Sequence, residues 1–355
     1  MQSALNYISK SSTIDQVQIK ATLKLLNEDA TIPFIARYRK EATGNLDELE
    51  IEQIQKLNQQ FLELEKLKEY ILKVIEEQGK LSADLKQSIQ GCLDLTSLED
   101  LYLPYKSKRE TKADKARKLG LEPLAKIIMA QNNTDISGAA AKFITKEVKS
   151  KDDALTGARL IMAEWMNERI GLRDQLRNFM ERKGKVKSTL VKGKELEAEK
   201  FKDYFKWEED LYRIPAHRFL AINRGENLGL LKFKITLPTI EVESKVANYF
   251  IRGHNFAANA QIELAAKDAW KRLLHPALEN EFKKLHKLKA DETSIKVFGE
   301  NLKQLLLSAP LGEKRVMAID PGFRTGCKVV CLDETGKLLY NETIFPHPPK
   351  NESKQ

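Results

Sequence analysis

The 355-residue chain is long enough for two or three domains, and its 42% apolar and 31% charged residues are ordinary for a globular protein. No run approaches the roughly 18 apolar residues of a membrane span, and the first residues lack the apolar core of a signal peptide. Three cysteines cannot supply a disulfide framework in a chain of this size, so we expect reduced thiols and a cytoplasmic protein. A formal net charge of +9 favours an anionic partner such as nucleic acid.

The first basic candidate follows a predicted helix over about residues 15–26. The segment TIPFIARYRKEATGNLDE (residues 31–48) places Pro33 in the first turn of a short second helix. Its candidate nucleic-acid-binding residues are Arg37, Arg39 and Lys40. The two helices predict a helix-turn-helix-like arrangement. Such pairs are also common in proteins that never contact DNA, so sequence-specific recognition of a groove is the less favoured alternative.

A long helix is predicted over residues 45–78, because apolar residues recur there at steps of three and four. The second basic segment, YKSKRETKADKARK (residues 105–118), should begin extended and become helical from about Thr111. Its candidate phosphate-binding residues are Lys106, Lys108, Arg109, Lys112 and Lys115. Crowded cations can neutralise phosphates and release counterions. The alternative is a solvated face, which is the usual role of a charge run.

Another long helix is predicted over residues 152–182, with Gly184 beyond its end. The third basic segment, RKGKVKSTLVKGK (residues 182–194), follows as an expected mobile connector. Its candidate residues are Lys183, Lys185 and Lys187. A mobile connector suits loose contact with a nucleic-acid backbone, and it equally suits a plain exposed linker.

The last third of the chain changes from helix to strand. Residues 230–237 predict a short strand or an extended connector, and residues 256–290 a helix that Pro276 kinks or divides. A last helix is predicted over residues 301–308. The segments VMAID, GCKVVCLD and LLYNETIF then predict three successive strands. We therefore place a domain boundary in the loop near residues 310–313.

Asp320 is the one candidate for metal chemistry. It ends the first of these strands and precedes Pro-Gly, within IDPGFRTGCK (residues 319–328). Ribonuclease-H-like nucleases hold a divalent metal with a carboxylate at such a position, and actin-like ATPases place the same strand-turn-strand against nucleotide phosphates. One carboxylate is not a site, and no later segment of this sequence completes one. We therefore predict no metal and no cofactor.

Other chemistries find no support in the sequence. It contains neither a Walker phosphate loop nor a GxGxxG motif, and its five histidines lack metal-ligand spacing. Cys327 and Cys331 lie four apart on a predicted strand and share one face. That face is expected to belong to the core and not to a zinc site.

Four long segments, in this order, resemble the Tex (transcription accessory protein) family. They are TIPFIARYRKEATGNLDE, LEDLYLPYKSKRETKADKARKLGLEPLA (residues 98–125), IPAHRFLAINRGE (residues 214–226) and ENLKQLLLSAPLGEKRVMAIDPGFRTGCK (residues 300–328). The resemblance implies a mainly α, multi-domain fold that ends in an incomplete α/β ribonuclease-H-like domain of YqgF type. The implied domains are an N-terminal helical region (residues 1–205), a central helical region (206–312) and the start of the YqgF-type domain (313–355).

The resemblance also implies a function. Members of the family bind nucleic acid and act as accessory factors in transcription, and their YqgF-type domain is generally regarded as lacking nuclease activity. We therefore expect a fragment that binds RNA and/or DNA largely without sequence specificity, acts as a scaffold in transcription and is not an enzyme. The alternatives are a metal-dependent nuclease in the full-length protein, acting through Asp320, and a docking module for RNA polymerase or other transcription machinery. No membrane partner is expected.

Overall fold

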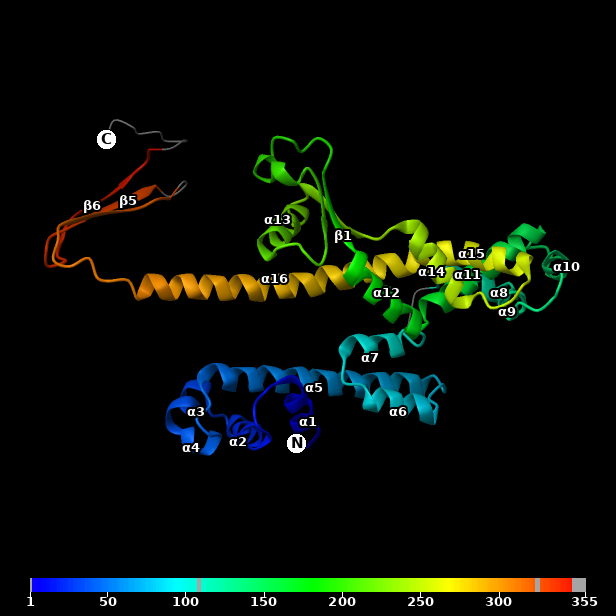
Figure 1. Ribbon diagram of the computed structural model, residues 1–355, viewed down its shortest axis with the longest axis horizontal. Helices are drawn as coiled ribbons and strands as arrows, with labels where there is room; N and C mark the ends of the chain where they lie inside the picture. The colour runs from blue at the N-terminus through cyan, green and yellow to red at the C-terminus, as the bar shows by residue number, and fades with distance from the viewer. Residues whose placement is uncertain (1, 107–109, 323–325, 347–355) are drawn as a thin grey trace. The chain divides into compact units, whose positions relative to one another are not determined.

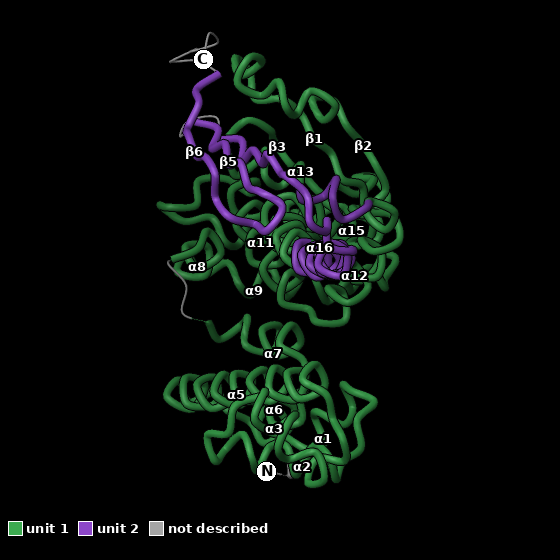
Figure 2. The backbone as a smooth tube through the Cα atoms, turned by 90° about the vertical axis from the view of Figure 1, so that its left-hand side faces the viewer, with its two compact units in different colours: residues 1–214, 221–286 green, residues 215–220, 287–355 purple. Residues whose placement is uncertain are grey.

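The computed structural model describes residues 2–106, 110–322 and 326–346. Two compact units make up the chain: residues 1–214 with 221–286, and residues 215–220 with 287–355 (Figure 2). Helices form most of the first unit, and a small antiparallel sheet forms the end of the second (Figure 1). Within the described ranges, no helix has the length and apolar character needed to cross a lipid bilayer.

The first five helices share one core. α1 (Gln2–Ser11), α2 (Gln16–Asn27), α3 (Ile32–Tyr38) and α4 (Lys40–Thr43) surround the first half of α5 (Glu48–Glu77). The fully buried side chains of this core are Ile8, Ile19, Ile35, Ile51 and Ile54. A capping box between Asp47 and Glu50 starts α5. The helices predicted over residues 15–26 and 45–78 are confirmed.

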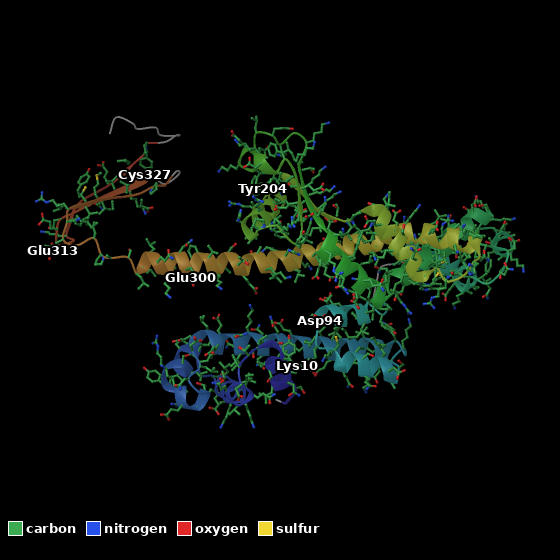
Figure 3. The ribbon with its side chains drawn as sticks, viewed as in Figure 1. Lys10, Asp94, Tyr204, Glu300, Glu313 and Cys327 are labelled. Atoms are coloured by element: carbon green, nitrogen blue, oxygen red, sulfur yellow. The ribbon has the colours of Figure 1, made fainter. Side chains whose placement is uncertain are left out.

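A second core lies against the other half of α5. α6 (Ala83–Gly91) and α7 (Leu95–Tyr102) pack on it through Ile89, Leu98 and Tyr102. The carboxylate of Asp94 accepts a hydrogen bond from Ser97 N at 2.7 Å and so begins α7 (Figure 3). At about 1.5 Å per residue, α5 is roughly 45 Å long, so the two cores occupy opposite ends of one rigid rod.

The next group of helices is organised around α11 (Lys151–Asn167). It packs against α8 (Lys112–Lys118), α9 (Glu122–Ala130), α10 (Ile136–Ala141) and α15 (Phe256–Ala269). The buried face of α11 is rich in small residues, which lets its neighbours approach closely. A Cβ atom at Gly157 would lie 2.3 Å from the Leu121 side chain, so a larger residue would force that side chain to move.

The helix predicted over residues 152–182 is two helices, and its predicted continuity is wrong. α11 ends at Asn167, and α12 (Ile170–Lys183) begins after Arg169, whose backbone is extended. Apolar periodicity continues across the break because both helices bury apolar faces. The first turn of α12 lies close to α14 (Thr239–Phe250), since a Cβ atom at Gly171 would lie 2.8 Å from the Tyr249 hydroxyl.

The predicted mobile connector after α12 is a β-strand, which corrects the sequence-based expectation. β1 (Lys185–Leu190) is the central strand of an antiparallel sheet with β2 (Lys206–Asp210) and β3 (Leu231–Thr236). Val186 and Ser188 are buried on one face, and the lysines alternate on the other. The 3₁₀ helix Glu199–Tyr204 precedes β2, and α13 (Ala216–Asn227) precedes β3. Residues 230–237 were predicted to form either a short strand or an extended connector, and the structure shows a strand there.

The helix predicted over residues 256–290 is interrupted, as Pro276 requires. α15 is followed by a π-helical turn (Trp270–Leu274) and then by α16 (His275–Leu306). The π turn accommodates the missing proline N–H. The last helix predicted over residues 301–308 is confirmed as helix up to Leu306, but it is the end of α16 and not a separate helix.

The second unit ends in the three predicted strands. β4 (Val316–Asp320), β5 (Cys327–Leu332) and β6 (Leu338–Ile344) form an antiparallel sheet in the order β4-β5-β6. Cys327, labelled in Figure 3, is the buried residue at the start of β5. Apolar side chains of the outer strands are exposed, with Met317 at 67% and Leu339 at 59%. The sheet therefore presents an apolar surface that its own residues do not cover.

Candidate nucleic-acid interface

The α3–α4 corner carries the first predicted cations, Arg37, Arg39 and Lys40. Pro33 lies in the first turn of α3, and Gly44 ends α4 in a left-handed conformation with φ 66°. Gln18 of α2 donates a hydrogen bond to the Gly44 carbonyl at 2.9 Å, which ties the corner to the first core. All three cations are exposed and line a hollow of about 420 Å³ together with Tyr38 and Glu41. No ion pair involves any of the three in the part of the chain that the structure describes.

Arg39 is the most constrained of these cations. Its guanidinium lies 5.0 Å from the centroid of the Phe34 ring and donates to the Tyr38 carbonyl at 3.1 Å. A guanidinium held over an aromatic ring keeps its charge and loses less side-chain entropy when it meets a phosphate. The corner thus presents a pre-ordered cation beside two flexible ones.

The second basic segment begins at Lys106, where the backbone turns back after α7. The Tyr105 carbonyl accepts a hydrogen bond from Gln78 at the end of α5, at 2.8 Å, which fixes this turn. Lys106 is exposed and lines a hollow of about 480 Å³ that also borders Asp114 and Arg117 of α8. Lys108 and Arg109 lie outside the described residues. Lys112 and Lys115 are exposed on α8, and over the described ranges neither has an ion-pair partner.

Two other cations of this segment are internally neutralised. Arg117 lies 2.5 Å from Glu164 of α11 and 2.9 Å from Asp114, and Lys118 lies 2.5 Å from Glu110. Burial lowers the pKa of Arg117, but the bonds to Glu164 and Asp114 outweigh it and raise that pKa overall. Arg117 therefore holds α8 against α11. We call the three described lysines of this segment that are exposed and form no ion pair, Lys106, Lys112 and Lys115, the lysine trio.

The third basic segment is paired as well as ordered. Lys185 and Lys187 point from β1 to the same carboxylate, Glu208 of β2, at 2.9 and 2.8 Å. The hydrogen bonds from Lys187 and Lys185 lower the pKa of Glu208. Lys183, at the end of α12, is exposed. The segment thus offers less unpaired charge than its sequence indicates.

Asp320 lies at the end of β4, where it is exposed and opposite Lys328 of β5 in the strand register. In the residues that the structure describes, no group of three or more acidic, histidine or cysteine side chains is placed to hold a metal ion. Cys327 and Cys331 share one face of β5, as predicted, with Cys327 buried and Cys331 half-buried.

Two features lie beyond what the sequence indicated. Asp100 of α7 is buried between Arg173 and Arg177 of α12. A hollow of about 310 Å³ is lined by the aromatic residues Trp165, Tyr249 and Phe250 and by the polar residues Gln131, Arg169 and Arg252. We call it the Trp165 pocket. Its residues come from segments about 120 positions apart, so no local pattern could reveal it.

The fold and these surfaces define a class: a mainly helical, multi-domain protein with exposed basic segments that ends in part of an α/β domain. Three family models match successive parts of the chain. They are the Tex-like protein N-terminal domain over residues 2–76, the Tex central region-like model over residues 131–298, and the Tex protein YqgF-like domain over residues 314–355. The chain belongs to the Tex family.

Individual relatives agree with this assignment. The chain is 39% identical to the transcriptional accessory protein Tex of Neisseria gonorrhoeae over 354 residues, covering 97% of this chain and 46% of the relative. It is 39% identical to protein YhgF of Escherichia coli over 346 residues, 93% of this chain and 44% of the relative. It is 29% identical over 356 residues to the human S1 RNA-binding domain-containing protein 1, with 96% and 36% covered. The chain therefore spans about half the length, or less, of these relatives.

Proposed function

We propose that this chain binds RNA or DNA through exposed lysine and arginine side chains, without sequence specificity, and serves as a non-catalytic scaffold in transcription. The Neisseria relative is named as a transcriptional accessory protein, which supports the role in transcription. The human relative is named for an S1 RNA-binding domain, which supports nucleic-acid binding. The proposed domain limits stay those predicted from the sequence, at residues 205 and 312.

The observation that carries the proposal is the exposed lysine trio. Lys112 and Lys115 lie on α8, a helix that Arg117 anchors to α11, and Lys106 borders the same hollow as α8. Exposed cations on a fixed frame can replace the counterions around a phosphate backbone with little ordering cost. Because phosphates repeat regardless of base sequence, such contacts position the chain without selecting a sequence.

A salt series on a labelled 24-base-pair DNA duplex and on a single-stranded RNA tests the proposal. If about five phosphates are neutralised, log affinity should fall with log salt at a slope of about −4 to −5 for the duplex. The variant Lys106→Gln/Lys112→Gln/Lys115→Gln should make that slope shallower by about two to three.

The comparison variant is Lys185→Gln/Lys187→Gln, which removes two lysines whose charge the shared Glu208 carboxylate already partly neutralises. It should change the slope by less than about one. A flat salt dependence, an absence of binding at low salt, or equal losses in the two variants would contradict the proposal. Incubation with Mg²⁺ should leave both labelled probes uncut.

Docking to RNA polymerase is the second candidate function, favoured by an apolar stripe on α16. Ile295, Phe298, Leu302 and Leu305 recur at helical spacing, and all are exposed, Ile295 by 70%. If this stripe docks, purified RNA polymerase should retain the chain after nuclease treatment, and Ile295→Glu/Phe298→Glu should abolish retention. If nuclease treatment abolishes retention, the association depends on nucleic acid and not on docking.

A further inference from the structure

We propose that the Trp165 pocket binds one unpaired nucleotide of a single-stranded nucleic acid, with the base among the aromatic side chains and the phosphate at Arg169 and Arg252. The inference deepens the proposed function, on which it rests for the class of ligand, and adds a site for bases to the proposed backbone contacts. At about 310 Å³ the hollow is at the small end of the range of ligand pockets.

The pocket is built from three separate segments. Trp165 lies near the end of α11, Arg169 in the turn before α12, and Tyr249 and Phe250 at the end of α14. The Tyr249 and Phe250 rings meet edge to face with their centroids 5.0 Å apart. Trp165 and both of these rings are half-buried, so each is held in place by packing while part of its surface stays accessible.

Gln131 fixes the segment that carries Arg252. Its Nε2 donates to the Phe250 carbonyl at 2.7 Å, and its Oε1 accepts from the backbone N–H groups of Arg252 and Gly253 at 2.7 and 2.8 Å. Gly253 is needed there, because a Cβ atom would lie 2.9 Å from Gln131. One amide side chain thus satisfies three backbone groups and holds the turn in a single conformation.

Asparagine side chains brace the same turn from its far side. Asn255 donates to the carbonyls of Asn132 and Thr134 at 2.6 and 3.0 Å, and Asn259 donates to the Gly253 carbonyl at 3.0 Å. Arg252 is therefore mounted on an ordered loop. Ordering before binding lowers the entropic cost of capturing a ligand.

The chemistry of the lining matches a nucleotide. Arg169 and Arg252 are exposed, and neither forms an ion pair with another described residue. Among the described residues that line the pocket, none carries a carboxylate. Two guanidinium groups suit a phosphate, and aromatic side chains suit a base. A base inside a duplex is already stacked and paired, so a single strand is the ligand that can fill the pocket.

Binding of a labelled six-nucleotide oligoadenylate, as RNA and as DNA, tests the site. Stacking and charge contacts of this kind change affinity by about five-fold to 150-fold when removed. We expect losses in that range for Trp165→Leu and for Arg169→Gln/Arg252→Gln. The charge-matched control Arg213→Gln/Arg224→Gln removes two exposed arginines outside the basic segments and the pocket, and it should bind like the unaltered chain.

Trp165→Phe separates stacking from folding. It keeps an aromatic ring, so its affinity should stay close to that of the unaltered chain. Adenosine monophosphate should quench part of the tryptophan fluorescence of the unaltered chain, and Trp165→Phe should lose that part.

Unchanged oligoadenylate binding in the folded double-arginine variant would overturn the inference, as would equal competition by a duplex of the same length. Binding of a labelled phosphotyrosine peptide that the double-arginine variant loses, together with no binding of oligoadenylate, would reassign the pocket to phosphopeptides. Failure here is distinguishable from failure of the proposed function. Loss of the pocket alone leaves the salt-dependent duplex binding by the lysine trio intact.

Discussion

Asp100 is a charged residue with only 3% of its surface exposed. Its two oxygens lie 2.7 Å from Arg173 and 2.7 Å from Arg177, and Arg177 lies 2.7 Å from Glu281 of α16. Burial disfavours the charge on Arg177, but the bonds from Glu281 and Asp100 outweigh it and raise its pKa. The network joins α7 to α12 and α16 within the first unit.

Replacing Asp100 with alanine should therefore be costly. Arg173 would be left buried without its partner, and breaking a buried pair in this way typically costs about 3–5 kcal/mol. Urea unfolding followed by circular dichroism measures the change. The control is Asp174→Ala, which removes an exposed partner of Arg177 and should cost less than about 1 kcal/mol. Equal losses would show that the buried network contributes no more than a surface pair.

Glu208 determines whether the charges of β1 are available. Its pKa is lowered by Lys187 and Lys185, so it is ionised at neutral pH, pairs with both lysines and offsets one of their two charges. Glu208→Gln should release them, which should strengthen duplex binding at low salt and make the salt slope steeper by about one to two. The control Glu195→Gln removes an exposed carboxylate nearby without releasing a lysine of β1. Unchanged binding by Glu208→Gln would exclude β1 from the interface.

The short helix α8 depends on its cap and on its neighbours for stability. Seven residues are too few for a stable isolated helix, so capping and packing on α11 must hold it. Asp114 accepts hydrogen bonds from the Thr111 backbone and hydroxyl at 2.9 and 2.8 Å, and pairs with Arg117. These bonds lower the pKa of Asp114, and the hydrogen bond from the Thr111 backbone has the largest effect.

The lowered pKa predicts a pH dependence. A carboxylate with a lowered folded-state pKa stabilises the fold at pH values above its ordinary pKa of about 4, and this stabilisation is lost as the pH falls through the lower folded value. Asp114→Asn should therefore destabilise the chain by about 0.5–1 kcal/mol at pH 7. The difference should shrink between pH 7 and pH 3. Thermal unfolding at both pH values checks this, and a difference that grows in acid would contradict it.

The Gln131 brace gives a prediction for the Trp165 pocket. Gln131 has a left-handed backbone with φ 53°, so Gln131→Gly relieves the backbone while it removes the side chain. We expect weaker oligoadenylate binding, by about five-fold or more, because the turn carrying Arg252 loses three hydrogen bonds. Hydrogen exchange at Arg252 and Gly253 should quicken in parallel. Weaker binding without quicker exchange would indicate direct contact by Gln131 instead of positioning.

Across the first unit, the basic surfaces do not converge. The α3–α4 corner packs at the start of α5, and Lys106 follows the turn that Gln78 fixes at its end. These points are separated by a helix of about 45 Å. If both clusters bind nucleic acid as proposed, we expect them to act as two contacts on a long ligand and as alternatives on a short one.

Ligand length tests this separation. An 8-base-pair duplex is about 27 Å long and a 24-base-pair duplex about 80 Å. With the long duplex, losses from Arg37→Gln/Arg39→Gln/Lys40→Gln and from the lysine-trio variant should add. With the short duplex, either variant alone should keep a salt slope near that of the unaltered chain. Additive losses on the short duplex would show that both clusters reach the same few phosphates.

Local periodicity and turn chemistry determined much of this protein from its sequence. They located α5, the start of α3 at Pro33, the start of α8 near Thr111 and the three strands after residue 315, because each depends on neighbours within a few positions. Four ordered motifs also indicated the family that the comparisons show. The sequence could not decide which cations stay unpaired, because Glu208 and Glu164 come from other elements.

Tertiary structure alone decided the remaining features. It made β1 a central strand, since a lysine-rich segment becomes ordered only when β2 and β3 pair with it. It divided the predicted helix at Arg169, where the backbone is extended and α12 begins close to Tyr249. It also assembled the Trp165 pocket from residues about 120 positions apart. Each depends on long-range contacts, whose free energy no local pattern records.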